Sequence, residues 1–174
     1  MALTDCNTNT VLTDKPENVN YLANNFFQFH IDRIPNFTYF IQSANLPMLS
    51  TRSINQPSTL GTFPKIPATN FIFDDLQITF LVDSQMKSWT ELYNWMKSIG
   101  NLKDTTSQID HHQKFSDATL LITNSAYKPI LKVTYYYIFP NTLGSINFSV
   151  TSQTTESVVC SANFSYSYFE IEEL

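Results

Sequence analysis

The stretch VVCSANFSYSYFE, residues 158–170, alternates between two kinds of side chain along its whole length. One set is mostly apolar or aromatic and the other is mostly small and polar: Cys160, Ala162, Phe164, Tyr166 and Tyr168 against Val159, Ser161, Asn163, Ser165 and Ser167. A period of two residues is typical of a strand with one buried and one exposed face. The pattern predicts one long strand from Val158 to about Glu170.

The same alternation predicts further strands upstream. They cover residues 27–31, 37–41, 71–82, 118–123, 130–139 and 146–150. Pro35-Asn36 is expected to turn the first two into a hairpin, and the segment Pro140 to Gly144 is expected to form another turn. Asp74-Asp75 marks a strand start. Consecutive strands joined by short turns favour an antiparallel β-sandwich or barrel, so we expect a mainly β fold.

One segment has helical spacing. Asp83 or Ser84 is a good N-cap, and Gly100 fits the C-terminal cap. The apolar stripe predicts one flanking helix, about residues 85–99: Met86, Trp89, Tyr93, Met96 and Ile99. Trp95 falls outside this stripe. It either contacts a partner or covers the edge of the stripe.

Residues 44–70 break the pattern. They contain four prolines, many Ser, Thr and Asn residues, and Gly61. Proline removes a hydrogen-bond donor, so any strands here are edge strands or extended arms. A floppy surface loop is the alternative, but the segment is too apolar for a solvated loop: Leu46, Met48, Leu49, Ile54, Leu60, Phe63 and Ile66. We therefore expect an extended arm within a single domain spanning 21–174, preceded by a flexible N-terminal arm at 1–20.

The composition indicates association with other protein chains. Of the 174 residues, 14% are aromatic and only 14% are charged. Protein interfaces are enriched in aromatic residues and depleted in Lys, Glu and Asp, although a monomer with a large aromatic core would look similar. The net charge of −5 and the lack of a basic cluster argue against a protein that grips nucleic acid. No signal peptide or membrane-spanning run is visible at the start or elsewhere.

Residue constellations that perform chemistry are nearly absent from the sequence. Three glycines leave no room for a phosphate-binding loop, and no Ser lies in a nucleophile elbow. Asp110-His111-His112 is the best metal candidate, but no spaced Cys or His completes a site. His30 has no visible catalytic partner, and Cys160 is expected to pack inertly, while Cys6 lies in the polar start. The sequence predicts no enzyme, cofactor or metal.

A series of short segments, in order, resembles the tail-tube proteins of contractile-tailed, T4-like bacteriophages. These segments are residues 25–31 (NFFQFHI), 36–47 (NFTYF through ANLP), 73–79 (FDDLQIT), the helix with Trp95, 139–144 (FPNTLG) and the last strand, 156–170. The similarity covers roughly residues 25–172. The Pro-rich 50–68 region and the N-terminal arm depart from the family's pattern.

The resemblance implies a structural role in a phage tail. In that family six copies form a ring, their sheets join edge to edge into one barrel, and rings stack into a tube that a contracting sheath surrounds. The implied partners are further copies of this chain, the tail sheath protein and baseplate or tube-initiator proteins. Genome DNA passes through the lumen without specific binding, and no stable membrane insertion is expected. The expected location is the virion tail, assembled in the host cytoplasm.

The resemblance also suggests which residues make assembly contacts: Leu46, Pro47, Met48, Leu60, Phe63, Trp95, Phe139 and Pro140. The main hypothesis is a tail-tube subunit. Related tube-like baseplate, terminator, secretion-system or injection-system proteins share the fold and remain alternatives. A small β-sandwich that binds carbohydrate through Trp89 or Trp95 is a further one, although a helical position is unusual for such residues.

Overall fold

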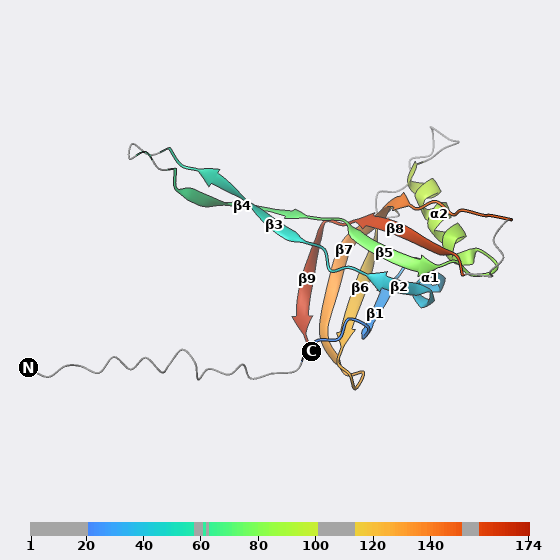
Figure 1. Ribbon diagram of the computed structural model, residues 1–174. Helices are drawn as coiled ribbons and strands as arrows, with labels where there is room; N and C mark the ends of the chain where they lie inside the picture. The colour runs from blue at the N-terminus through green and yellow to red at the C-terminus, as the bar shows by residue number, and fades with distance from the viewer. Residues whose placement is uncertain (1–20, 58–60, 62, 101–113, 151–156) are drawn as a thin grey trace, which may run out of the picture.

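The computed structural model describes residues 21–57, 61, 63–100, 114–150 and 157–174. The fold is mainly β, as predicted, with one long helix on its flank (Figure 1). The strands are β1 (Phe27–Ile31), β2 (Ile41–Ala44), β3 (Leu49–Asn55), β4 (Lys65–Phe73), β5 (Leu76–Leu81), β6 (Ser116–Thr123), β7 (Pro129–Leu143), β8 (Val159–Ser165) and β9 (Tyr168–Glu173). The helices are α1 (Pro35–Tyr39) and α2 (Lys87–Gly100).

Strand β7 joins the two halves of the body. Its first part pairs with β6 and β9, and its last part pairs with β8. The strand bends near Tyr137, where φ is +57° and the backbone N–H donates to the Asp117 carboxylate at 3.1 Å. One antiparallel path therefore runs β1-β6-β7-β8-β5-β2, and β9 also pairs with β7, on the edge opposite β6.

The core lies between these two halves and is rich in aromatic residues. Phe37, Phe80 and Phe164 are fully buried, and the Phe37 ring lies 4.5 Å from Phe80 and 6.2 Å from Phe164. Inward residues of β5 and β8 share this core in the predicted alternation, and Cys160 packs within it at 2% exposure. The expectation that Cys160 is a packed residue is confirmed.

Helix α2 confirms the predicted helix but presents a different face to the core. The buried residues are Ser88, Leu92 and Trp95, whereas Tyr93 is 42% exposed. Trp95 is anchored because its indole N–H donates to the Lys114 carbonyl at 3.1 Å. The predicted stripe counted apolar residues, but Ser88 is buried as a polar residue whose hydroxyl donates to the Asp83 carboxylate at 2.9 Å.

The predicted hairpin of residues 27–41 is wrong. Residues 35–39 form α1 instead of a strand, with Pro35 in the first turn, where its missing N–H is not needed. The flanking strands go to different halves of the body: β1 pairs with β6, and β2 pairs with β5. Phe37 still points inward, because one helical turn can bury a single side chain as well as a strand can.

Two other strand predictions need correction. The 71–82 strand is two strands separated at Asp74-Asp75, since β4 pairs with β3 and β5 pairs with β8. The 158–170 strand is β8 and β9, and the chain crosses between the two halves at Ser167, whose N–H donates to the Tyr136 carbonyl. Asp74-Asp75, read from the sequence as a strand start, does precede β5, whereas alternation continues across the break at Ser167 and gave no sign of it.

The end of β7 and the segment after it also differ from prediction. The expected turn at 140–144 is absent, because β7 continues to Leu143 and accommodates Pro140 beside a register shift. The expected 146–150 strand does not form in the described part of the chain. Both edges of the neighbouring β8 are already occupied by β5 and β7, so no edge is open to it there. Phe148 remains 76% exposed.

Candidate assembly surface

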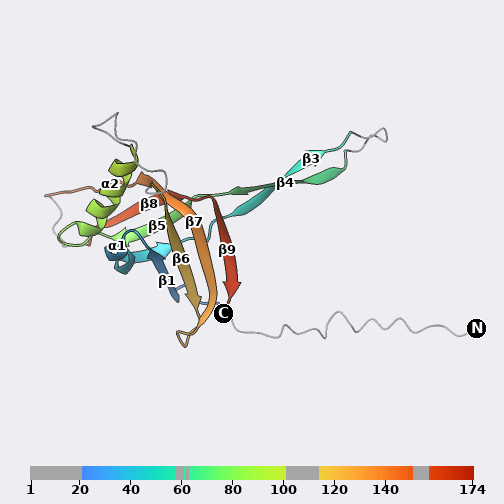
Figure 2. The same ribbon diagram turned by 180° about the vertical axis from the view of Figure 1, so that it is seen from behind.

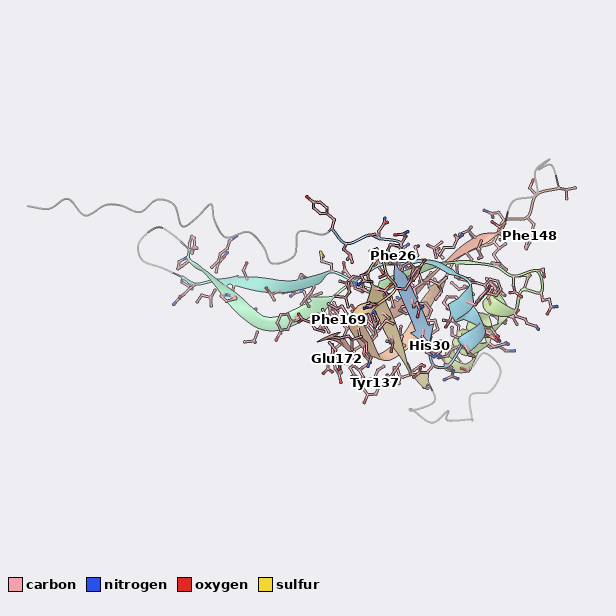
Figure 3. All side chains as sticks on the ribbon, turned by 90° about the horizontal axis from the view of Figure 1, so that it is seen from below. Phe26, His30, Tyr137, Phe148, Phe169 and Glu172 are labelled. Carbon is pink, nitrogen blue, oxygen red and sulfur yellow. The ribbon has the colours of Figure 1, made fainter. Side chains whose placement is uncertain are left out.

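Strands β3 and β4 form a two-stranded arm that projects from the body (Figures 1 and 2). The segment 44–70, expected to be an extended arm, supplies β3 and most of β4. Its strands pair only with each other among the described residues, and Pro67 is accommodated in an edge position beside a register shift. The arm leaves large apolar side chains exposed: Leu49, Ile54, Phe63, Ile66, Phe71 and Ile72. Figure 3 shows the side chains of this arm standing clear of the body.

The inner end of the arm is fixed by an aromatic cluster. The Phe73 ring makes edge contacts with Phe169 at 5.6 Å and with Tyr166 at 5.9 Å. Figure 3 labels Phe169 close to the point where the arm meets the body. Asp75 adds polar bonds, since its carboxylate accepts from the Ser165 hydroxyl at 2.8 Å and from the Asn141 amide at 3.2 Å. The arm is thus a projecting element with a fixed root.

The eight predicted contact residues fall into two groups. Leu46, Met48 and Phe63 are 52%, 61% and 67% exposed on or beside the arm. The other group is buried or half-buried in the body: Pro47, Trp95, Phe139 and Pro140. Leu60 lies outside the described residues. Trp95 was expected either to contact a partner or to cover the edge of the apolar stripe. The structure supports packing within the chain, because Trp95 is buried.

The free edge of β1 offers backbone hydrogen-bonding groups. Asp32 donates to Asp117, and Thr123 donates to Phe26, so the even-numbered residues of β1 bond to β6. In an antiparallel pair such residues alternate with ones whose backbone points away. The N–H and C=O groups of Phe27 and Phe29 therefore face the open edge. They border a groove whose far wall includes Thr38 and Tyr39.

The free edge of β9 has the same parity. Leu174 donates to the Ile130 carbonyl, which places the even-numbered residues of β9 in the bonded set with β7. The backbone groups of Phe169, Ile171 and Glu173 consequently face outward. On both edges the outward-facing backbone belongs mostly to residues with apolar side chains. These edges could not be predicted from the sequence, because the order of the strands, and which residues of an edge strand hydrogen-bond inward, depend on the tertiary structure.

A second apolar surface lies on α2. Trp89 and Tyr93 stack with their rings 5.4 Å apart, and they form a shallow groove together with Met96 and Leu143. Three residues of the predicted buried stripe, Trp89, Tyr93 and Met96, therefore line a partly exposed groove. Lys97 also lines this groove.

The candidate catalytic and metal residues lie in separate segments of the chain. His30 is exposed, and its two ring nitrogens lie 3.3 Å from the Asp32 carboxylate and 3.5 Å from the Thr38 hydroxyl. The described residues contain no group of three metal-ligating side chains, and Asp110-His111-His112 lies outside them. None of the described helices is both long and apolar enough to span a membrane.

The comparison with protein families decides what kind of molecule carries these surfaces. The pattern of the family described as phage tail tube protein matches residues 10–172. The chain belongs to the phage tail tube protein family. It is therefore related to structural proteins of phage tails, which agrees with a molecule whose notable surfaces are strand edges and an apolar arm.

Individual relatives of this tail tube family member include proteins at tube ends. The "Tail tube terminator protein" of Enterobacteria phage T4 is 26% identical over 147 residues, 83% of each chain. Among solved structures, the anti-feeding prophage tube terminating cap is 19% identical, covers 94% of this chain and 99% of its own, and has a TM-score of 0.64. The PVC sheath-tube complex of an extracellular contractile injection system is 20% identical, with coverage of 88% and 93% and a TM-score of 0.60. These structures show the shared fold.

Proposed function

We propose that this protein is a tail tube terminator, a ring of identical subunits that binds the end of a contractile tail's tube and ends it. The observation that carries the proposal is the similarity to the T4 terminator over 83% of both chains. This departs from the main hypothesis drawn from sequence, a stacking tube subunit, and takes up its terminator alternative.

Ring formation is supported by the two open edges. Strands β1 and β9 lie on opposite sides of one four-stranded run, β9-β7-β6-β1, and point in opposite directions. Pairing β1 with β9 of the next copy is therefore antiparallel and uses the outward-facing backbone on both. It would place Phe27 and Phe29 on the same face as Ile171, which is 52% exposed in the single chain. Repetition around six copies closes the ring and leaves no exposed edge in this four-stranded run.

The role we propose is structural and non-enzymatic. Genome DNA would pass through the ring, and the low basic content of the chain fits a channel that does not retain phosphates. Tube, sheath and baseplate-type proteins would be neighbours in the virion tail. The second candidate, a main tube subunit, is favoured by the family's description as phage tail tube protein and by the fold shared with the PVC sheath-tube complex.

Electron microscopy of negatively stained protein separates these two roles. A terminator alone should form discrete rings, and it should stop elongation when added to growing tubes of the tube protein from the same phage. A tube subunit should instead stack into open-ended tubes of variable length. A protein that stays monomeric at high concentration and does not bind tube ends would refute both.

A further inference from the structure

The four-stranded run β9-β7-β6-β1 has a polar face that is turned away from the core, because the alternate residues, such as Phe29 and Val133, are buried. The strand registers place four side chains in one row across this polar face: His30, Thr119, Thr134 and Glu170. Residues that lie opposite one another on neighbouring strands share a face of the sheet. His30 and Glu170 therefore lie at the two ends of one row, each on an open edge of the run.

The two edges of the polar face differ in charge. The β9 edge carries the carboxylates of Glu170 and Glu172, whereas the β1 edge carries the His30 imidazole and the Gln28 amide. The His30 side chain is 53% exposed, so it can still meet a partner. Glu170 accepts one hydrogen bond from the Tyr136 hydroxyl at 3.1 Å. A carboxylate can accept about four such bonds, so Glu170 keeps room for another donor.

Bonding parity decides which faces meet when β1 of one copy pairs with β9 of the next. Odd-numbered residues carry the outward-facing backbone on both edges, so odd pairs with odd, and the even-numbered side chains share the polar face. The register that pairs all five residues of β1 with β9 puts Glu170 opposite His30. A slide by two residues puts Tyr168 or Glu172 opposite His30 and leaves Glu170 diagonal to it, still within reach of a long side chain.

We propose that His30 of one copy pairs with Glu170 on β9 of the next copy, and that protonation of His30 tightens the ring. This inference rests on the proposed function, because the pair needs the β1–β9 contact between copies. Histidine changes charge near pH 6.5 in ordinary surroundings. Since Glu170 approaches His30 only in the ring, the ring binds the proton more tightly than the free subunit does. By linkage, the association constant rises as the pH falls through this range.

The other groups around His30 act in the same direction. Its own chain contributes Asp32 at 3.3 Å and Asp117, which lies two residues from Thr119 on the same face of β6. Tyr39 borders the same groove. On the side of the next copy, Lys132 is paired with Glu172 at 3.5 Å, one strand farther in than β9. With a neutral imidazole, carboxylates of the two copies oppose one another across the contact, and like charges placed so are unfavourable.

The pH dependence of self-association tests the pair. For the wild type, sedimentation velocity should give an association constant per contact that rises about two- to fivefold between about pH 8 and about pH 5.5, the range for an exposed ion pair, and less at high salt. His30→Gln should keep the high-pH value throughout, and His30→Lys, which stays charged, the low-pH value. Glu170→Gln should reduce the response. His111→Gln/His112→Gln, which removes the other two histidines of the chain, is the control and should respond like the wild type.

Disulfide cross-linking tests the position of His30 in the contact. Opposite residues of this kind have Cα atoms about 4.5 Å apart, within the range that a disulfide bridges. His30→Cys, combined in turn with Tyr168→Cys, Glu170→Cys or Glu172→Cys, should cross-link copies in one of the three variants under mild oxidation. His30→Cys/Ile171→Cys has the same number of cysteines, but its two new thiols lie on opposite faces, so it should not.

Three results would overturn the pair while the wild type still forms rings. They are a pH response that survives in His30→Gln, a response that disappears in the control without His111 and His112, and cross-linking at Ile171→Cys or at none of the three even-numbered positions. If the wild type forms no ring at either pH, the proposed function itself fails, and the pair fails with it.

Discussion

The body and the arm use similar apolar residues in opposite ways. In the body, Phe37, Phe80 and Phe164 are fully buried against one another. In the arm, Ile54 and Phe63 are 60% and 67% exposed on a two-stranded hairpin. An isolated two-stranded hairpin is marginal in water, and exposed apolar surface of this kind marks interaction sites. The body is therefore stabilised by its own packing, whereas the arm leaves its apolar side chains uncovered within the single chain.

The largest expected effect is in the body. Phe80→Ala removes a fully buried ring that lies 4.5 Å from Phe37, and it should lower the free energy of unfolding by about 3–5 kcal/mol. Urea unfolding followed by circular dichroism, at a protein concentration low enough to keep the chain monomeric, measures this change.

Phe63→Ala is the counterpart in the arm. The same truncation should change the unfolding free energy by no more than about 0.5 kcal/mol, because the ring is mostly exposed. It should weaken self-association instead. Equal destabilisation by the two substitutions would mean that the arm is part of the folded core and would contradict the contrast.

The root of the arm tests the boundary between the two regions. Phe73 is half-buried and packs edge-on against Tyr166 and Phe169, so Phe73→Ala should cost about 1–2 kcal/mol of unfolding free energy. It should also increase amide hydrogen exchange in β3 and β4, because the arm loses its anchor. Phe71→Ala, two residues farther out and 59% exposed, is the control and should change neither quantity appreciably.

The sequence pattern predicted the body better than its connections. Alternation identified the buried faces of β5 and β8 because a period of two reports which side chains point inward. It could not report partners, so the hairpin of residues 27–41 and the single strand of 158–170 were wrong. The arm was found from its unusual mixture of prolines and apolar residues. The free edges of β1 and β9 depend on strand order, and no local pattern contains that order.

The smallest expected effect lies in the aromatic cluster that joins body and arm. The hydroxyls of Tyr135 and Tyr166 are buried, and neither has a hydrogen-bond partner in the described part of the chain. An unpaired buried hydroxyl is unfavourable, so Tyr135→Phe should be neutral or stabilise the fold by up to about 1 kcal/mol. A destabilisation above 1 kcal/mol would show that the hydroxyl has a partner.

The same hydroxyls predict how stability depends on alkaline pH. Burial raises the pKa of Tyr166 to about 12, with Asp74 and Asp75 adding to the increase, and burial also raises the pKa of Tyr135. Below pH 10 both tyrosines are protonated in the folded and the unfolded chain, so they add no pH dependence there. Between pH 10 and about 12 the unfolded chain loses these protons first, and the free energy of unfolding falls.

This fall in the free energy of unfolding should be smaller in Tyr135→Phe/Tyr166→Phe than in the wild type when urea unfolding is repeated across this pH range. Tyr127→Phe, whose side chain is 74% exposed, should leave it unchanged, which separates the buried cluster from tyrosine ionisation in general.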